Sequence, residues 1–502
     1  MDAFSSLMTG FGVALRPENL LFALLGCVIG QIVGVLPGIG PIAGMAILLP
    51  LTFRLDATGA IIMLSAIYYG AMYGGTITSV LINVPGEGAS AVTAIDGYQM
   101  AKQGRAGPAL AIAAIGSFVG GTLATMALVI AAPPLATVAL RFGPPEFFAL
   151  MVVALCLLVG LSGKSVLTSL ISGLIGLALS IPGTDIVEGT PRLTYGITDL
   201  LDGVGFVPVI MGLFGIGEIL FNAESQIQQV FDAKVSSIWL TMKDIKDSVW
   251  PILRGTAIGL FMALIPGIGT IVPTIASYAV EKKMSKHPEK FGTGAIEGVA
   301  GPETTNNAYA NGALIPLFTL GVPASPTIAV LPGAFMMNGL TPGPFLFRDK
   351  PEFVWGIIAS LYIGNLILLV LNLPLVGLWV SVLKIPYSIL FPLVLAFTVV
   401  GAYTVSHSLF DVGLLIAFGV IGYIFKKLDF PIAPMAFTLI LGPLTEKALR
   451  QAMSMSGGEL AILTRSPIAT GLLVVSALVV LVPLVSLFRG RSARRADFGA
   501  PE

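Results

Sequence analysis

Two copies of one helix-breaking motif constrain this chain more than any other feature. Residues 36–41 read Leu-Pro-Gly-Ile-Gly-Pro, and residues 265–270 read Ile-Pro-Gly-Ile-Gly-Thr. Both copies lie in long apolar sequence, where proline removes a backbone donor and glycine loosens the backbone, so each copy predicts an interrupted helix. In hydrocarbon, the freed backbone groups must face protein, water or a ligand. Paired breaks in two halves of a membrane protein are typical of secondary transporters.

The composition also places the chain in a membrane. Of 502 residues, 55% are hydrophobic and 11% are charged, whereas a soluble domain carries roughly 25% charged residues. The apolar stretches predict roughly ten to fourteen membrane elements, some of them half-helices or re-entrant hairpins. A formal net charge of zero argues against a nucleic-acid partner. With two cysteines and two histidines, the sequence predicts neither a disulfide framework nor a thiolate or histidine metal site.

The repeat extends beyond the first break. When Val84-Pro85 is aligned with Val322-Pro323, a polar helix of small residues precedes each pair, and a Gly-Pro loop follows at 107–108 and 343–344. Four features in the same order predict an internal repeat. The basic loop comes late in the first half, at Lys102 and Arg105, but early in the second half, at 281–290. This reversal predicts an inverted-topology repeat.

Loop charge also predicts the orientation and the division of the chain. Cytoplasmic loops collect Lys and Arg, so Lys426-Lys427 and the arginine-rich tail from Arg489 are expected in the cytoplasm. The predicted fold class is an all-α polytopic membrane protein with an inverted-topology repeat, broken helices and re-entrant hairpins. Its expected parts are the first repeat half with flanking helices (1–221), a polar linker with an amphipathic helix (222–250), the second inverted half (251–445), and a C-terminal helix with a basic cytoplasmic tail (446–502).

Polar side chains gather around the breaks of both halves. Helix starts with free amides favour an anion, whereas hydroxyl, amide and carbonyl oxygens favour a hard cation such as Na⁺. Any one of these side chains could instead join packed helices, but two clusters beside four breaks favour a binding site. The predicted substrate-binding residues are Pro37, Gly38, Gly40, Thr76, Asn83, Pro85, Gly86, Ser90, Pro266, Gly267, Asn306, Asn307, Asn311, Pro323, Ser325 and Thr327.

Acidic residues are scarce in the repeated core, and Glu87 and Glu303 are the candidates for cation binding or gating. The competing interpretation of both is a carboxylate at a loop mouth or helix start, whereas Asp96 is expected to cap a helix or form an ion pair. Neither polar cluster contains a cationic residue, so an anionic substrate would need co-bound Na⁺ or H⁺. No other cofactor is expected. The predicted Na⁺ ligands are Gly38, Asn83, Glu87, Gly267, Glu303 and Asn307.

Enzymatic motifs are not found. Residues 160–165 resemble the end of a P-loop, but Leu158 stands where that motif requires glycine. Neither a His-Glu-x-x-His nor a Gly-x-Ser-x-Gly sequence occurs, so we expect no enzyme. A channel-like pore and a non-transporting membrane scaffold remain alternatives to a transporter, although two breaks in each half suit an occluded site better than an open pore.

Several stretches together resemble the large permease subunit of the tripartite tricarboxylate transporter family, TctA. The resemblance spans roughly residues 20–443. In the second half, Ala324 stands where the family often has Gly, and Tyr309 and Asn311 replace small residues, so citrate is not implied as the substrate. The stretches that carry the resemblance are 34–41, 83–90, 96–100, 104–108, 302–307 and 321–325.

The resemblance implies a multi-pass permease of the bacterial inner (plasma) membrane that imports di- or tricarboxylates by sodium symport. Its implied partners are a small membrane subunit (TctB-like), a periplasmic solute-binding protein (TctC-like), the carboxylate and the lipid bilayer, and a homo-oligomer stays open. By analogy, the repeat-containing part moves like an elevator against a scaffold. The hairpins around Pro37, Pro85, Pro266 and Pro323 would then travel with the substrate.

Overall fold

The computed structural model of the protein describes residues 3–36, 39–161, 165–185, 188–224, 238–383 and 387–488. Within these residues the fold is helical, and the only strands are β1 (Gly183–Thr184) and β2 (Pro191–Arg192), which pair antiparallel. In the described part of the chain, seven helices are long and apolar enough to span a membrane, and six shorter apolar helices accompany them. These helices confirm an all-α polytopic membrane protein. The inverted topology of the repeats stays a prediction.

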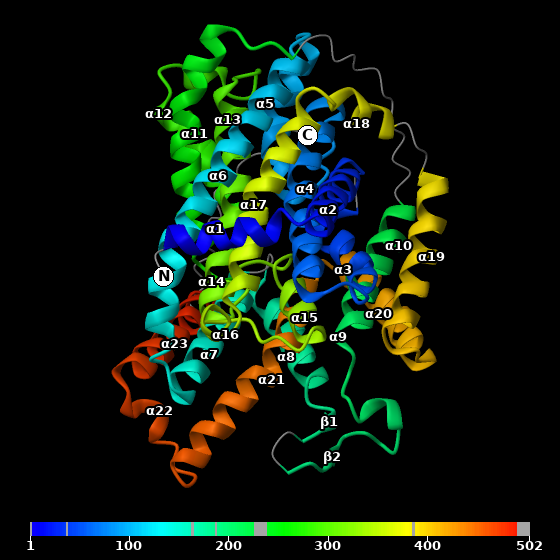
Figure 1. The fold of residues 1–502 in the computed structure, drawn as a ribbon, viewed down its shortest axis with the longest axis vertical. Helices are drawn as coiled ribbons and strands as arrows, with labels where there is room; N and C mark the ends of the chain where they lie inside the picture. The colour runs from blue at the N-terminus through cyan, green and yellow to red at the C-terminus, as the bar shows by residue number, and fades with distance from the viewer. Residues whose placement is uncertain are drawn as a thin grey trace.

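The first half of the chain forms ten helices, shown in blue to green in Figure 1. A π-helical segment, Met211–Ile216, joins the last two of them into one continuous helix. The bounds are α1 (Ala3–Ala14), α2 (Pro17–Val35), α3 (Gly40–Thr52), α4 (Ala57–Ile82), α5 (Ala91–Lys102), α6 (Ala106–Ala139), α7 (Pro144–Leu161), α8 (Val166–Leu179), α9 (Phe206–Ile210) and α10 (Gly217–Glu224).

The second half continues from green to red (Figure 1). Its helices are α11 (Met242–Ala263), α12 (Ile271–Met284), α13 (Glu297–Gly312), α14 (Leu314–Leu320), α15 (Val330–Met337), α16 (Phe345–Asp349), α17 (Pro351–Asn372), α18 (Val376–Val382), α19 (Tyr387–Ser406), α20 (Leu409–Lys427), α21 (Ile432–Met455), α22 (Ile462–Arg465) and α23 (Pro467–Phe488).

Helix α4 forms the centre of the bundle and packs most closely on α2. Three glycines of α2, four residues apart, allow this approach: Gly26, Gly30 and Gly34. A Cβ atom at Gly30 would lie 2.4 Å from the carbonyl oxygen of Ile67, and one at Gly34 would lie 2.2 Å from that of Ala71. Such stripes of small residues let membrane helices bring their backbones together.

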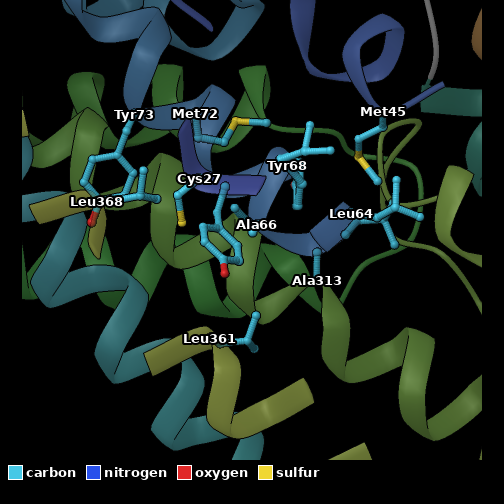
Figure 2. Packing of buried hydrophobic residues seen from close by; sticks show 14 of the residues in the cluster. Cys27, Met45, Leu64, Ala66, Tyr68, Met72, Tyr73, Ala313, Leu361 and Leu368 are labelled. Atoms are coloured by element: carbon cyan, nitrogen blue, oxygen red, sulfur yellow. The ribbon is translucent and has the colours of Figure 1, made fainter. Parts of the chain in front are cut away.

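Apolar side chains fill the space around α4. Figure 2 shows this packing, with side chains from α2, α3, α4 and α17, and Ala313 between α13 and α14, gathered in one cluster. The cluster isolates the centre of α4 from the surroundings, so any polar group within it needs a partner inside the protein. The labelled side chains are Cys27, Met45, Leu64, Ala66, Tyr68, Met72, Tyr73, Ala313, Leu361 and Leu368.

The predicted helix breaks are confirmed. Helix α2 ends at Val35 and α3 begins at Gly40, whose φ is +67°, while Pro37 and Gly38 lie outside the described residues. In the second half, α11 ends at Ala263, and the glycines at 267 and 269 both have positive φ before α12 begins. The second breaks follow left-handed residues, Asn83 (φ 57°) and Gly321 (φ 73°), each directly before Val-Pro. Left-handed residues commonly end helices.

All three predicted domain boundaries fall inside helices: the first in α10, the second in α11 and the third in α21. The amphipathic helix expected within 222–250 is α11, which begins with a Thr241–Asp244 capping box and continues to Ala263. Helix α21 likewise runs through the boundary at 445. Part of the linker and the tail from Arg489 lie outside the described residues. The four-part division of the chain therefore stays a prediction.

The two basic loops lie together at one end of the bundle, where α5, α11 and α12 meet (Figure 1). Gln103 donates from Nε2 to the carbonyl oxygen of Thr293 at 2.7 Å, and Arg105 pairs with Asp244 at 2.5 Å. Asp96 has the capping role that its position indicated, but it caps the other half's loop. Its Oδ1 accepts the amides of residues 292, 294 and 295, each at 2.8 Å, and Oδ2 accepts the Tyr278 hydroxyl.

This capping predicts that Asp96 contributes more to stability than an ordinary helix cap. Asp96→Ala leaves these amides and a hydroxyl without an acceptor, at about 1–3 kcal/mol for each group that stays buried. Asp56→Ala is the control, because exposed Asp56 also accepts two amides, those of Thr58 and Gly59, and losing such a cap costs about 1 kcal/mol. We expect a clearly larger fall in melting temperature in detergent for Asp96→Ala; equal shifts would contradict this role.

Candidate functional site

The four helix breaks meet at one cavity of about 750 Å³. Each break contributes a short run of residues to its wall: 39–43, 85–88, 267–272 and 325–327. The remaining wall comes from the continuous helix α9–α10, with Phe214 and Glu218, from Lys426 at the end of α20, and from residues 430–433. Segments more than 200 residues apart thus surround a volume typical of a small-molecule site.

The first turns of α3 and α12 line this cavity. The first amides of a helix have no partner within the helix, and the helix dipole makes this end favourable for anions. The breaks therefore bring two such helix ends to the same space. Ser325 lies in the fourth break, where its hydroxyl accepts the Ile328 amide at 3.2 Å.

The predicted substrate-binding residues divide into three groups. Pro37 and Gly38 lie outside the described residues. Others line the cavity: Gly40, Pro85, Gly86, Gly267, Ser325 and Thr327. The rest lie outside its lining: Thr76, Asn83, Ser90, Pro266, Asn306, Asn307, Asn311 and Pro323.

Glu87 is the predicted carboxylate that reaches the cavity wall. Its side chain is 6% exposed, at the start of a short turn, Gly88–Ser90. Oε2 accepts the Ala89 amide at 2.8 Å, and Oε1 accepts Nδ2 of Asn306 at 2.9 Å. Asn306 belongs to α13, so this hydrogen bond joins a break of the first half to a helix of the second.

Glu303 lies behind the cavity wall and is fully buried on α13. Its carboxylate accepts the hydroxyl of Thr76 at 2.7 Å and the hydroxyl of Thr93. Within the described part of the chain, neither Glu87 nor Glu303 pairs with a lysine, arginine or histidine. Both carboxyl groups are thus held by neutral donors alone, so no cationic side chain among the described residues compensates either of them when it is ionised.

Two amide oxygens beside these carboxylates lack hydrogen-bond partners. Oδ1 of Asn306 and Oδ1 of Asn307 are buried and unpartnered, while Nδ2 of Asn307 donates to Ser117 Oγ at 2.7 Å. Buried acceptors without a donor usually mark a ligand or water. Carboxylate, amide and hydroxyl oxygens suit a hard cation. Among the described residues, no cluster of three or more His, Cys, Asp and Glu side chains offers a transition-metal site.

Three other predicted residues, Asn83, Ser90 and Asn311, have local positions or contacts away from the cavity lining. Asn83 is exposed in the left-handed conformation that ends α4, and it lies away from the cavity lining. Ser90 closes the turn after Glu87 by donating to the Glu87 carbonyl oxygen at 2.8 Å. Asn311 donates from Nδ2 to the carbonyl oxygen of Asn307 at 3.1 Å.

Tyr309 joins two breaks of the second half. Its buried hydroxyl donates to the carbonyl oxygen of Ala324 at 2.9 Å, and the amide of Gly267 donates to the same oxygen at 3.0 Å. These two hydrogen bonds tie the breaks around residues 267 and 324 to each other beside the cavity.

Two charged residues of the cavity lining, Glu218 and Lys426, were not predicted from the sequence. Glu218 forms an ion pair with Lys426, whose ammonium lies 5.0 Å from the centroid of the Phe221 ring. Lys426-Lys427 was interpreted only as a loop marker. The glycines in both apolar segments are the sequence feature that indicates this pair, because small residues let two helices pack closely. In the structure, a Cβ atom at Gly212 would lie 2.5 Å from the Leu415 carbonyl oxygen.

Comparison with known proteins gives a family match across this whole site. The sequence profile of the Tripartite tricarboxylate transporter TctA family matches residues 20–437, from α2 into α21. An Agrobacterium vitis protein, named as an uncharacterized 52.8 kDa protein in the TAR-I ttuC' 3' region, is 48% identical over 492 residues, 98% of each chain. A second A. vitis protein, from the TAR-II ttuC' 3' region, is 46% identical over 233 residues, covering 46% of this chain and 96% of its own. No solved structure matches the chain.

The break after α4 packs so closely on neighbouring backbone that no side chain larger than that of glycine is expected to fit at residue 86. A Cβ atom there would lie 2.0 Å from the Gly34 carbonyl oxygen and 2.7 Å from Gly75 Cα, both backbone atoms. At Gly88 it would instead meet the flexible end of Ile271, at 2.7 Å. We expect Gly86→Ala to destabilise the protein by about 1–3 kcal/mol or more and Gly88→Ala to have little effect, as measured by melting temperature. A larger fall in melting temperature for Gly88→Ala than for Gly86→Ala would contradict this close packing.

Proposed function

The chain belongs to the tripartite tricarboxylate transporter TctA family, and from this premise we propose that it is the permease subunit of a cation-coupled secondary transporter that imports carboxylates. The family is a transporter family, and the helices make the chain a multi-pass membrane protein. We further propose Na⁺ as the coupling ion and di- or tricarboxylates as the substrates. The proposed partners are a small membrane subunit and a periplasmic solute-binding protein.

The charge of the cavity wall is the observation that supports cation coupling. Among the described lining residues there are one lysine (Lys426) and two acidic residues (Glu87 and Glu218), and the buried carboxyl group of Glu303 lies behind them. A carboxylate substrate entering this space would be repelled by the net negative charge. A cation bound beside Glu87 and Glu303 would offset that repulsion. Substrate and cation would then bind better together than alone, which is the requirement for coupling.

The residues present fit a Na⁺ ion chemically. Glu87 and Glu303 supply carboxylate oxygens, and Asn306 and Asn307 supply amide oxygens without donors. The ion would provide the positive charge that the protein lacks at this depth. The first turns of α3 and α12 would then receive a carboxylate of the substrate through their backbone amides.

We propose that the basic end of the bundle faces the cytoplasm of a bacterial inner membrane. The loops around Lys102 and 281–290 meet at that end. Lys427 and its partner Glu224 lie at the ends of α20 and α10. Lysine-rich loops stay on the cytoplasmic side of the membrane. Burial of Glu303 behind the cavity favours a closed binding site over a channel-like pore.

Uptake by reconstituted vesicles tests the proposed function. Proteoliposomes with the permease and both partner proteins should accumulate labelled di- or tricarboxylates saturably, and an inward Na⁺ gradient should drive this uptake. Uptake that follows a proton gradient and ignores Na⁺ would contradict the proposed ion but keep the transporter. If no carboxylate enters although all three proteins are present, the proposed substrate class is wrong.

Removing the charge of Glu303 should weaken cation coupling. Glu303→Gln keeps the side-chain shape, so we expect a folded protein whose half-saturating Na⁺ concentration in the uptake assay rises about tenfold or more, since losing a charged ligand costs over 1.4 kcal/mol. Glu459→Gln is the control, because Glu459 forms an exposed pair with Arg465 at 2.7 Å. An unchanged Na⁺ dependence in Glu303→Gln, with a normal melting temperature, would remove Glu303 from the cation site.

A further inference from the structure

Lys426 is the one cationic side chain among the described residues that line the cavity. It lies at the end of α20, with its side chain 28% exposed, and pairs with Glu218, which is 20% exposed. The four breaks form the rest of the wall, and no other lysine or arginine in the described lining approaches them. An anion in the cavity therefore has one side chain of opposite charge available to it.

Close helix packing fixes Lys426 and Glu218 within the wall. A Cβ atom at Gly422 would lie 2.5 Å from the carbonyl oxygen of Leu213, and one at Gly217 would lie 3.0 Å from the carbonyl carbon of Gly422. The helix that carries Glu218 and the helix that carries Lys426 thus touch through their backbones. Glu218 directly follows Gly217, and Lys426 lies one turn after Gly422, so both members of the ion pair are next to this close contact.

The neighbouring lysine provides a comparison within the same helix. Lys427 pairs with Glu224 at 2.8 Å, but both side chains are about half exposed and neither lines the cavity. Exposed pairs of this kind contribute little because water competes for both charges. The Lys426–Glu218 pair is less exposed to water. Replacing Glu218 by another carboxylate as the partner of Lys426 therefore has a larger effect on substrate affinity.

A substrate carboxylate can take the place of Glu218 at Lys426. The ammonium would exchange one carboxylate for another, so its charge stays compensated. Glu218 would keep a donor, because Nδ2 of Asn222 donates to its Oε1 at 3.2 Å. Glu218 therefore acts as the counter-ion of Lys426 when no substrate is bound.

We propose that Lys426 binds a second carboxylate of the substrate, in competition with Glu218, and thereby selects acids with at least two carboxylates. This inference rests on the proposed function. The helix starts of α3 and α12 and the side chain of Lys426 line the same cavity, and each favours an anionic group. A molecule that engages a helix start and Lys426 together must carry two anionic groups, whereas a monocarboxylate bound at a helix start leaves the Lys426–Glu218 pair closed.

Kinetics with a matched pair of acids test this selection in the reconstituted three-protein system. Succinate and butyrate have the same chain length and differ in one carboxylate. Losing a charged hydrogen bond to the substrate should raise the succinate KM of Lys426→Gln about tenfold or more, with the low butyrate uptake unchanged. Lys426→Arg should retain most of the preference for succinate. Lys427→Gln is the control and should behave as the wild-type protein.

Glu218→Gln provides a second test, in which the expected result is tighter substrate binding and not a loss of transport. It removes the competing carboxylate, so the succinate KM should fall. An unchanged ratio of succinate to butyrate uptake in folded Lys426→Gln, or a rise in KM in Glu218→Gln, would overturn the inference while leaving carboxylate transport intact. If the wild-type protein transports no carboxylate, the proposed function fails, and this inference fails with it.

Discussion

Two buried carboxyl groups that have no cationic partner among the described residues are the constraint on which the rest of the structure depends. Glu87 and Glu303 are buried and accept hydrogen bonds from neutral donors: Asn306, Ala89, Thr76 and Thr93. An interior built for stability alone would pair or remove such charges, because burying them is costly. Their persistence beside two unpartnered amide oxygens indicates a site that is completed by a positive charge, and cation coupling follows from that requirement.

The polar centre is tolerated because small residues bring the helices together around it. Helix α13 is buried from Gly298 to Gly312 although it carries threonine, asparagine and glutamate side chains. Its neighbours approach it through glycines, since a Cβ atom at Gly120 would lie 2.6 Å from the Thr304 carbonyl oxygen and one at Gly255 would lie 2.5 Å from that of Gly301. This approach lets α13 reach both halves, so that Asn306 contacts Glu87 while Glu303 contacts Thr76. The four breaks then close around a single cavity.

The sequence predicted the features that follow from local chemistry. Pro-Gly motifs located the breaks, and the scarcity of charge identified Glu87 and Glu303. Residue type alone could not separate a ligand from a backbone role, so Asn83 was assigned to the site although its left-handed conformation ends α4 outside the cavity lining. Lys426 and Glu218 were missed because they meet across two helices that are distant in sequence. Only the packing of Gly212, Gly217 and Gly422 brings that pair to the cavity.

Calorimetric titration of the purified permease with its small membrane subunit tests the central claim most directly. The dissociation constant of succinate is measured with and without saturating Na⁺, and that of Na⁺ with and without succinate. If the buried carboxylates require a cation, each ligand should strengthen the other by the same factor, about tenfold or more. Succinate affinity that is equal with and without Na⁺, and equal at every pH where the protein is folded, would contradict the account.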